Sequence, residues 1–333
     1  MESKRLNSKF NPIFVEIRKF FVSREETLVV SHFFPDGDAI GSVIAFSGML
    51  EQWGIPYTLA IDDACPEKYS FLDGFSSIIN LKSTPLNRKF DRVVILDAGA
   101  ISRIGSANDL LAPNCQILNI DHHFTGDIYG NINLVNTDAA ATSEILFDLF
   151  VALDIEITKK MAMALFTGIL TDTGRFRFAN TSSHAMHVAA ELLTKGVDPG
   201  LLTENIYYNL PVSQAGAIAK ALNSLEMHLG DRVSMIGLAS SDKVTDTEGF
   251  VEYAASIKDV LLAAFYCELE PNLYKVSLRS RCDVDVSAVA NGFGGGGHKK
   301  ASGFRFRGDL TSLKAKLIGT LEKYLDADAL THG

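Results

Sequence analysis

The length, composition and charge of the chain narrow the classes of protein to which it can belong. Its 333 residues, 47% hydrophobic and 21% charged, exclude a mostly disordered chain and exceed what one compact domain needs, so we expect two globular domains. A formal net charge of -9 excludes a protein that coats long duplex nucleic acid through its overall electrostatic field.

Features of export, membrane insertion and disulfide bonding are absent from the sequence pattern. No apolar stretch approaches the roughly 20 residues that cross a bilayer, and the first residues lead into no apolar region of the signal-peptide type. We therefore expect a cytoplasmic location without membrane contact. The four cysteines lack the C-x-x-C spacing of a structural zinc site, and we expect them to stay reduced.

The first half of the chain has the alternating pattern of an α/β domain. A short apolar run at residues 28–30 predicts a buried strand, and residues 39–53 predict a helix that ends before Gly54 and Pro56. Further strands are predicted at 57–61, 92–96 and 116–120, and helices at 141–153, 159–170 and 183–195. This order predicts a parallel sheet in an α/β/α arrangement.

The second half of the chain has a different pattern of predicted strands and helices. The predicted domain boundary lies where two prolines and two glycines surround an apolar segment. We predict a first domain at residues 1–200, a linker at 201–212, and a smaller α/β domain with a mixed sheet at 213–333. Its predicted strands are 233–239, 261–269 and 274–279, its predicted helices 247–257, 284–290 and 310–324, and a glycine run occupies 294–297. The apolar segment 206–210 fits either a hinge or an interface, so a homodimer stays an open alternative.

Acidic and histidine residues follow the predicted strands of the first domain. Because ligands of a parallel sheet bind beyond the carboxyl ends of its strands, such side chains converge although they are far apart in sequence. The positions are His32, Asp36 and Asp38; Asp97; Asp121, His122 and His123; and Asp172. Taken alone, each of these motifs also fits a purely structural role, as a turn, a cap or a pair of surface histidines.

Taken together, these residues predict a metal centre. Four aspartates in one cleft repel one another unless cations neutralise them, and two divalent ions would do so. A mixed set of imidazoles and carboxylates suits manganese, iron or zinc better than calcium. A carboxylate that bridges two ions is what a two-metal hydrolase needs to polarise a phosphoryl group and ionise a water molecule.

At these residues the chain resembles the DHH phosphoesterases, a family named for the motif that stands here as Asp121-His122-His123. The segments 277–280, 284–287, 294–298 and 301–304 are similar to the DHH-associated C-terminal domain of one subgroup. The resemblance covers nearly the whole chain. It implies an enzyme of the oligoribonuclease (nano-RNase) and 3′-phosphoadenosine 5′-phosphate (pAp) phosphatase type, with its active site in the cleft between the two domains.

The resemblance also implies a role for each residue. The implied ligand sets are His32, Asp36 and Asp97 for one ion and Asp38, Asp97, His122 and Asp172 for the other. Asp97 would then bridge two divalent ions, for which manganese is expected, and would be catalytic together with His123, placed over the substrate phosphate. Asp121 would accept a bond from the imidazole of a metal ligand and so fix its ring orientation, or it would cap a structural element.

The glycine run and nearby cations predict the part that binds substrate. Glycines let the backbone approach a ligand and point successive N–H groups at an anion, so a phosphate cradle is predicted, with a flexible linker as the alternative. Arg279 is the predicted partner of a terminal phosphate or base, and Arg103 fits either a substrate contact or a loop anchor. The predicted substrate-binding residues are Arg279, Gly295, Gly296, Gly297, His298 and Arg103.

These observations predict a metal-dependent phosphodiesterase that converts short oligoribonucleotides and dinucleotides such as pApA to 5′-mononucleotides. Hydrolysis of pAp or of cyclic di-AMP is a further activity within this prediction, so the expected partners are short RNA, dinucleotides or nucleotide phosphates. Three alternatives remain. They are a RecJ-like single-strand exonuclease, which would need further domains; an inorganic pyrophosphatase, which the glycine run disfavours; and a non-catalytic RNA-binding module, which the intact metal motifs disfavour.

Overall fold

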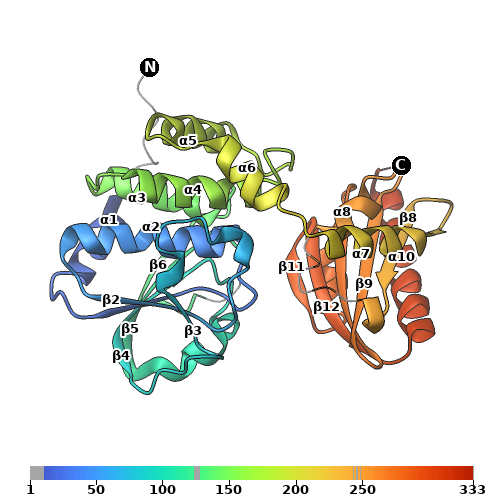
Figure 1. Cartoon of the computed structure of the whole chain (residues 1–333), viewed down its shortest axis with the longest axis horizontal. Helices are drawn as coiled ribbons and strands as arrows, with labels where there is room; N and C mark the ends of the chain where they lie inside the picture. Colours follow the sequence, from blue (N-terminus) through green and yellow to red (C-terminus); the bar gives the residue numbers. More distant parts are fainter. Residues whose placement is uncertain (1–10, 124–127, 243, 245–246, 248, 333) are drawn as a thin grey trace. The chain divides into compact units, whose positions relative to one another are not determined.

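The chain folds into two compact units, Met1–Asn209 and Leu210–Gly333 (Figure 1). The computed structural model describes residues 11–123, 128–242, 244, 247 and 249–332. Each unit has its own six-stranded sheet and its own hydrophobic clusters. Across these described residues, no helix is both long enough and apolar enough to span a bilayer.

The first unit is built on parallel strands in the order β3-β2-β1-β4-β5-β6. The strands are β1 (Thr27–Val30), β2 (Tyr57–Ile61), β3 (Ile78–Asn80), β4 (Phe90–Leu96), β5 (Leu111–Asp121) and β6 (Ile132–Val135). The chain extends the sheet from β1 in one direction and from β4 in the other, so the strand order reverses between these two neighbours. Ligands of such sheets bind beyond the carboxyl ends of the strands at this reversal.

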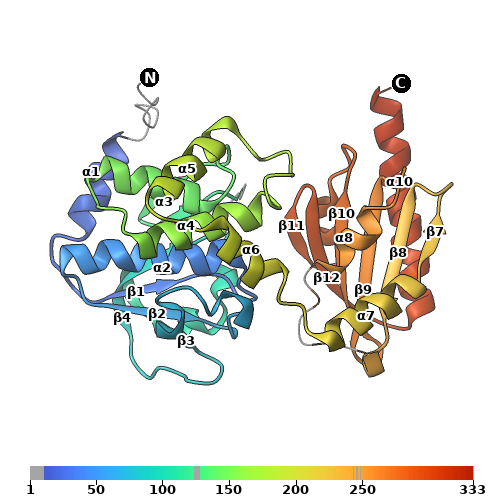
Figure 2. The same cartoon turned by 45° about the horizontal axis from the view of Figure 1, so that its top comes forward.

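The two faces of this sheet are covered differently. The helices are α1 (Asn11–Phe20), α2 (Gly37–Trp53), α3 (Thr142–Ala152), α4 (Lys159–Asp172), α5 (Ser183–Thr194) and α6 (Pro199–Tyr207). Figure 2 shows α2, α3 and α4 together on one side of the strands, where Val29 and Leu118 pack into the helical core. On the other face Leu28 and Ile95 pack against Ile104 of the 3₁₀ segment η4 (Ile101–Leu110). The sheet is parallel as predicted. Its second layer is the 3₁₀ segment η4, which a kink at Gly105, at φ +60°, divides into two parts.

The second unit contains the predicted mixed sheet, in the order β11-β12-β10-β9-β8-β7. Its strands are β7 (Glu226–His228), β8 (Val233–Leu238), β9 (Leu262–Glu270), β10 (Leu273–Ser280), β11 (Gly296–His298) and β12 (Ala301–Arg307), and its helices α7 (Val212–Asn223), α8 (Phe250–Ala255), α9 (Val286–Asn291) and α10 (Leu310–His332). Only β8 and β9 pair in parallel. Helices α7 and α8 cover one face, and α9 and α10 cover the other.

The predicted linker and the glycine run differ from the expectations set by the sequence. Most of the predicted linker is helix α6, which reaches Tyr207, because Pro199 occupies the first turn, where a proline favours helix formation. Part of the glycine run is strand β11, which pairs with β12 on one side and lies at the edge of the sheet. The side chain of His298 lies outside the described residues.

Candidate metal centre

The loops that follow three neighbouring strands carry three of the predicted ligands of the first unit. His32 lies just after β1, Asp97 just after β4, and His122 just after β5. These strands are adjacent, in the order β1-β4-β5, so their carboxyl ends bring the three side chains to the point where the strand order reverses. All three residues are buried.

Asp97 lies at the centre of this cluster. Its backbone has φ +56°, a left-handed conformation that is uncommon for a residue with a side chain, and its N–H donates to the Ile120 carbonyl at 3.0 Å. The carboxylate lies 3.7 Å from His32 Nε2 through Oδ2 and 3.4 Å from His122 Nε2 through Oδ1. One buried carboxylate therefore reaches both imidazoles, one with each oxygen.

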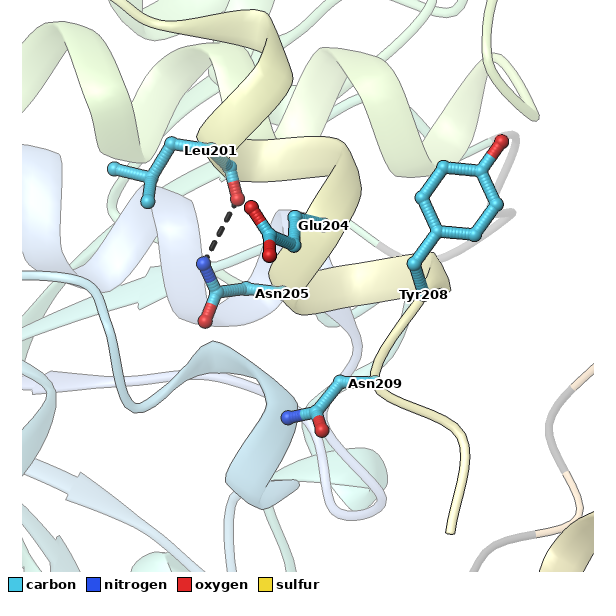
Figure 3. Close-up of a pocket in the computed structure, with 5 residues that line it drawn as sticks. All are labelled: Leu201, Glu204, Asn205, Tyr208 and Asn209. Carbon is cyan, nitrogen blue, oxygen red and sulfur yellow. Dashed lines mark hydrogen bonds between the residues drawn. The ribbon is translucent and has the colours of Figure 1, made fainter. Parts of the chain in front are cut away.

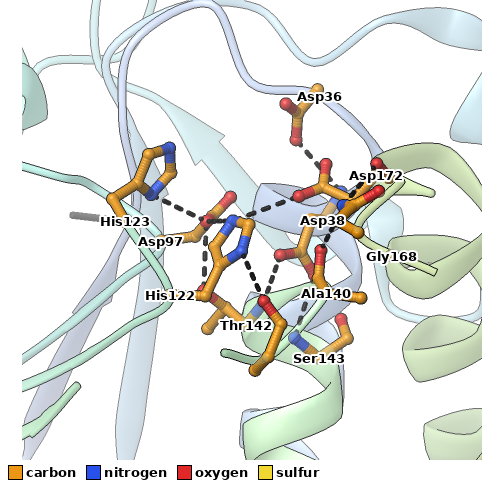
Figure 4. Close-up of polar contacts among 12 residues, drawn as sticks. Asp36, Asp38, Asp97, His122, His123, Ala140, Thr142, Ser143, Gly168 and Asp172 are labelled. Atoms are coloured by element: carbon orange, nitrogen blue, oxygen red, sulfur yellow. Dashed lines mark hydrogen bonds and ion pairs between the residues drawn. The ribbon is translucent and has the colours of Figure 1, made fainter. Parts of the chain in front are cut away.

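Helix α2 supplies two more carboxylates at its N-terminus. Asp36 is the N-cap, and its Oδ1 accepts the N–H groups of Asp38 and Ala39, while its Oδ2 lies 4.0 Å from His32 Nε2. Asp38, in the first turn, is fully buried. At the end of α4, Asp172 places Oδ2 3.1 Å from His122 Nε2. Figure 4 shows these carboxylates turned toward one another around His122 and Asp97.

The N-terminus of α3 holds Asp38 in place. The backbone N–H of Thr142 donates to Asp38 Oδ2 at 2.6 Å, and that of Ser143 donates to Oδ1 at 3.0 Å. The Thr142 hydroxyl also donates to Asp97 Oδ1 at 3.0 Å. The positive end of a helix dipole favours a carboxylate at this place. Thr142 and Ser143 were not among the site residues predicted from the sequence. Small residues at this place indicate where a helix starts, but they do not indicate which carboxylate its N–H groups bind.

Asp121 contacts His123, which follows His122 in the DHH motif. Its Oδ1 lies 2.7 Å from His123 Nδ1, and its Oδ2 accepts the Gly99 N–H at 2.5 Å. His122 Nδ1 lies instead 3.4 Å from the carbonyl of Ala139. The carboxylate thus orients the imidazole that was predicted to sit over the substrate phosphate, and it also holds the loop after β4.

Burial and mutual repulsion shift the carboxyl groups in different directions. Burial raises the pKa of Asp38 well above its usual range, and the charges of Asp97 and Asp172 raise it further. Burial likewise raises the pKa of Asp172 to about 6, against the opposing hydrogen bond from His122. At Asp97, burial acts to raise the pKa, but hydrogen bonds from His122 and His32 and the charges of His123 and His122 together hold it well below its usual range. The negative charge of the carboxylates in this cluster therefore exceeds the positive charge that its imidazoles can supply.

The donor atoms fit divalent cations. Three sets of ligand atoms each lie within 4.8 Å of one another: His32, Asp36 and Asp97; Asp38, His122 and Asp172; and Asp97, His122 and His123. The first set contains the three residues that the resemblance implied for one ion, and the second contains three of the four implied for the other, without Asp97. The third set adds His123, which was expected to face the substrate and not a metal ion. Imidazole nitrogens with carboxylate oxygens suit Mn²⁺, Fe²⁺ or Zn²⁺, and cations would relieve the repulsion among the buried carboxylates.

The predicted substrate residues lie in both units. In the first, a Cβ built on Gly99 would lie 3.3 Å from Arg103 Nη1 and 3.6 Å from the His123 ring, so the Arg103 guanidinium lies beside the loop after β4. In the second, Arg279 Nε donates to Glu252 Oε1 at 2.6 Å and Nη1 to the Leu278 carbonyl at 2.9 Å. These two bonds fix the plane of the Arg279 guanidinium.

A separate pocket of about 350 Å³ lies at the end of α6. It is lined by Leu201, Glu204, Asn205, Tyr208 and Asn209 (Figure 3). Asn205 Nδ2 donates to the Leu201 carbonyl at 2.8 Å within it. None of the predicted site residues lines this pocket, so it adds nothing to the metal centre.

Comparison with known proteins identifies the two domains of the chain. Residues 26–169 match the model of the DHH family N-terminal domain, and residues 208–326 match the DHHA1 domain. The bifunctional oligoribonuclease and PAP phosphatase NrnA of Thermus thermophilus is 32% identical over 301 residues, which cover 89% of each chain. The protein of the same name from Bacillus subtilis is 24% identical, over 85% of this chain and 90% of its own.

Among solved structures, an exopolyphosphatase-related protein from Bacteroides fragilis superposes with a TM-score of 0.84 at 25% identity, over 95% of this chain and 96% of its own. The chain belongs to the DHH family and carries the DHHA1 domain after the DHH domain. It is a phosphoesterase, as the sequence predicted, of a family that uses divalent metal ions.

Proposed function

We propose that the protein is a manganese-dependent phosphodiesterase that hydrolyses short oligoribonucleotides and dinucleotides to 5′-mononucleotides and also dephosphorylates pAp. The observation that carries this proposal is the position of Asp97, with one oxygen 3.7 Å from His32 and the other 3.4 Å from His122, between two sets of ligands. The similarity to proteins named oligoribonuclease and PAP phosphatase supports the same substrate class.

The proposed roles of the ligands follow from the donor sets. His32, Asp36 and Asp97 would hold one ion, and Asp38, Asp97, His122 and Asp172 the other. When bound, two divalent ions polarise the phosphoryl group and lower the pKa of a water molecule. Manganese is proposed because the mixed imidazole and carboxylate donors suit it better than calcium.

His123 is the proposed proton donor of the reaction. Its Nδ1 faces Asp121 Oδ1 at 2.7 Å, so the proton that it transfers to the leaving oxygen is the one on Nε2. Asp121 also accepts the Gly99 N–H, which holds the carboxylate still while the imidazole gains and loses this proton. Asp121 thereby keeps the His123 ring in one orientation.

The second unit is proposed to select short substrates. Arg279, fixed by Glu252, and the N–H groups on the outer side of edge strand β11 are the proposed partners of a terminal phosphate or base. A net charge of -9 disfavours a long polyanion, which needs a continuous basic surface. A reducing, cytoplasmic setting is part of the proposal because Cys65, Cys115, Cys267 and Cys282 are free thiols.

The test is a chromatographic product analysis with Mn²⁺ present. Linear pApA, cyclic di-AMP, pAp, a long single-stranded RNA and pyrophosphate are offered in parallel, with Asp97→Asn as the inactive control and Asp109→Asn, exposed in η4, as the matched control. Rapid conversion of pApA to AMP with slow attack on the long RNA supports the proposal. Turnover of pyrophosphate alone, faster attack on the long RNA, or an Asp97→Asn protein that keeps more than about a tenth of the activity contradicts it.

A further inference from the structure

Phe34 is an aromatic residue displayed to solvent beside the metal centre. It lies two residues after His32 and two before Asp36, and 58% of its surface is exposed. Its backbone has φ +56°, a conformation that glycine and asparagine adopt more readily than a bulky side chain. Neither burial nor backbone preference explains a phenylalanine here, and strain of this kind concentrates at functional sites.

The residues at the ends of neighbouring strands hold this loop in place. The Phe34 N–H donates to Asp63 Oδ2 at 3.1 Å, and Lys82, which forms an ion pair with Asp63, places Nζ 6.0 Å from the centre of the Phe34 ring. The ring packs at 84° to that of Phe33, with 5.4 Å between centres. The Phe33 N–H donates to the Arg103 carbonyl at 2.8 Å. The backbone and the ring of Phe34 are thus both positioned before any ligand arrives.

The distance from the ring to the metal centre is short. Two residues span at most about 7 Å of backbone, so Phe34 lies within the reach of a nucleotide whose phosphate is at His32 and Asp36. The phenyl group offers no metal ligand and no hydrogen bond. What it offers is a flat π surface, on which bases of any sequence stack, next to the positive charge of Lys82.

We propose that Phe34 is the stacking platform for the nucleobase next to the phosphate that is cleaved. This subsite lies in the first unit, separate from Arg279 and the glycine run of the second. The inference rests on the proposed function, because it assumes a nucleotide substrate, and it adds which residue recognises the base.

The test is equilibrium binding, which needs no turnover. Calorimetry with Mn²⁺ present compares AMP with ribose 5-phosphate, which lacks the base, for the wild type and for Phe34→Asn, Phe34→Tyr and Val22→Asn. Asparagine adopts a positive φ more readily than phenylalanine does, so we expect Phe34→Asn to keep the fold. Val22, which follows α1 and is 75% exposed, is the matched apolar control.

We expect Phe34→Asn to bind AMP about tenfold more weakly, a change of about 1.4 kcal/mol, and ribose 5-phosphate as the wild type does. Phe34→Tyr and Val22→Asn keep the wild-type affinity for AMP. In turnover of pApA, Phe34→Asn raises KM by a similar factor and leaves kcat within about twofold of the wild type.

Any of three results would disprove the subsite. They are equal affinity of the wild type for AMP and ribose 5-phosphate, unchanged affinity of Phe34→Asn for AMP, and an equal loss of affinity of Phe34→Asn for both ligands. Its failure is distinct from failure of the proposed function. A protein that hydrolyses pApA without any contribution from Phe34 disproves the subsite alone. A protein that binds AMP through Phe34 but does not cleave pApA disproves the proposed function alone.

Discussion

The hydroxyl of Thr142 donates a hydrogen bond to Asp97 Oδ1 across 3.0 Å. These residues are 45 positions apart in sequence, and both are buried. The backbone N–H of Thr142 donates to Asp38 at the same time. One residue at the start of α3 therefore sets the distance between two of the proposed metal ligands.

Thr142→Val is expected to weaken Mn²⁺ binding by about 10- to 100-fold, the usual effect of losing a partner that orients a ligand. Valine has nearly the same shape and keeps the backbone bond to Asp38, but it cannot donate to Asp97. Titration of the protein with Mn²⁺, followed by electron paramagnetic resonance, measures the change. Thr142→Ser keeps the hydroxyl and should bind Mn²⁺ like the wild type; equal affinity in Thr142→Val would show that this bond does not position Asp97.

Replacement of His123 by asparagine is expected to lower kcat by about 10²- to 10⁴-fold, because the proposed proton donor is lost. Affinity for Mn²⁺ should change little, since His32 and His122 are the proposed imidazole ligands. His187→Asn, an exposed histidine of α5, is the matched control. Steady-state kinetics with pApA and a Mn²⁺ titration separate the two effects. If Mn²⁺ binding falls in step with kcat, His123 is a ligand, as its place beside Asp97 and His122 also allows.

The residues of the candidate metal centre could be grouped from the sequence because the carboxyl ends of parallel strands lie at the same edge of a sheet. Short buried runs end at His32, Asp97 and Asp121, and a parallel sheet brings such ends together without any knowledge of side-chain packing. The mixed sheet of the second unit was also predicted, although its strands β7, β11 and β12 were missed. Strand β12 is the longest of the three. Its alternation, with Phe304 and Phe306 buried and Arg305 and Arg307 exposed, is a period-two signal that could have found it.

The remaining features depend on tertiary contacts that no local pattern encodes. Thr142 and Asp38 are 104 residues apart, so their bond follows only from how α3 and α2 pack. Pro199 and Pro211 were interpreted as signs of a domain boundary, yet one begins α6 and the other directly precedes α7, because proline favours a helix start as much as a turn. Phe34 was given no role, since its exposure and positive φ are visible only in the folded chain.

Gly168→Ala is expected to destabilise the fold by about 1–3 kcal/mol and to weaken Mn²⁺ binding. A Cβ at this buried position of α4 would overlap Ser143 Oγ and Asp38 Oδ1 (Figure 4). Gly216→Ala, at an exposed position of α7 with open space around it, should instead stabilise by about 0.5–1 kcal/mol. Urea unfolding of both variants measures the free energies of unfolding. Equal effects at the two glycines would contradict the close approach of α4 to Asp38.

The pair formed by His184 and Asp148 predicts a pH-dependent part of the stability. His184 Nε2 lies 2.9 Å from Asp148 Oδ2, and this hydrogen bond raises the pKa of His184 above 6.5. Because the folded pKa exceeds the unfolded one, the stabilisation is fully present below about pH 6.5 and is lost as pH rises through the folded value. The His184 side chain is 39% exposed, so solvent screening limits the effect to about 0.5–1 kcal/mol.

His184→Gln should therefore lower the free energy of unfolding relative to the wild type more at about pH 5.5 than at about pH 8.5. Urea unfolding of both proteins at both pH values measures how the effect of the substitution on the free energy of unfolding changes with pH. A chelator is present, so that bound metal ions do not contribute to the stability. Met186→Gln, at an exposed position of the same helix and without a titrating group, should show the same small effect at both pH values. A larger effect of His184→Gln at the higher pH would reverse the sign and show that the neutral imidazole is the form that Asp148 stabilises.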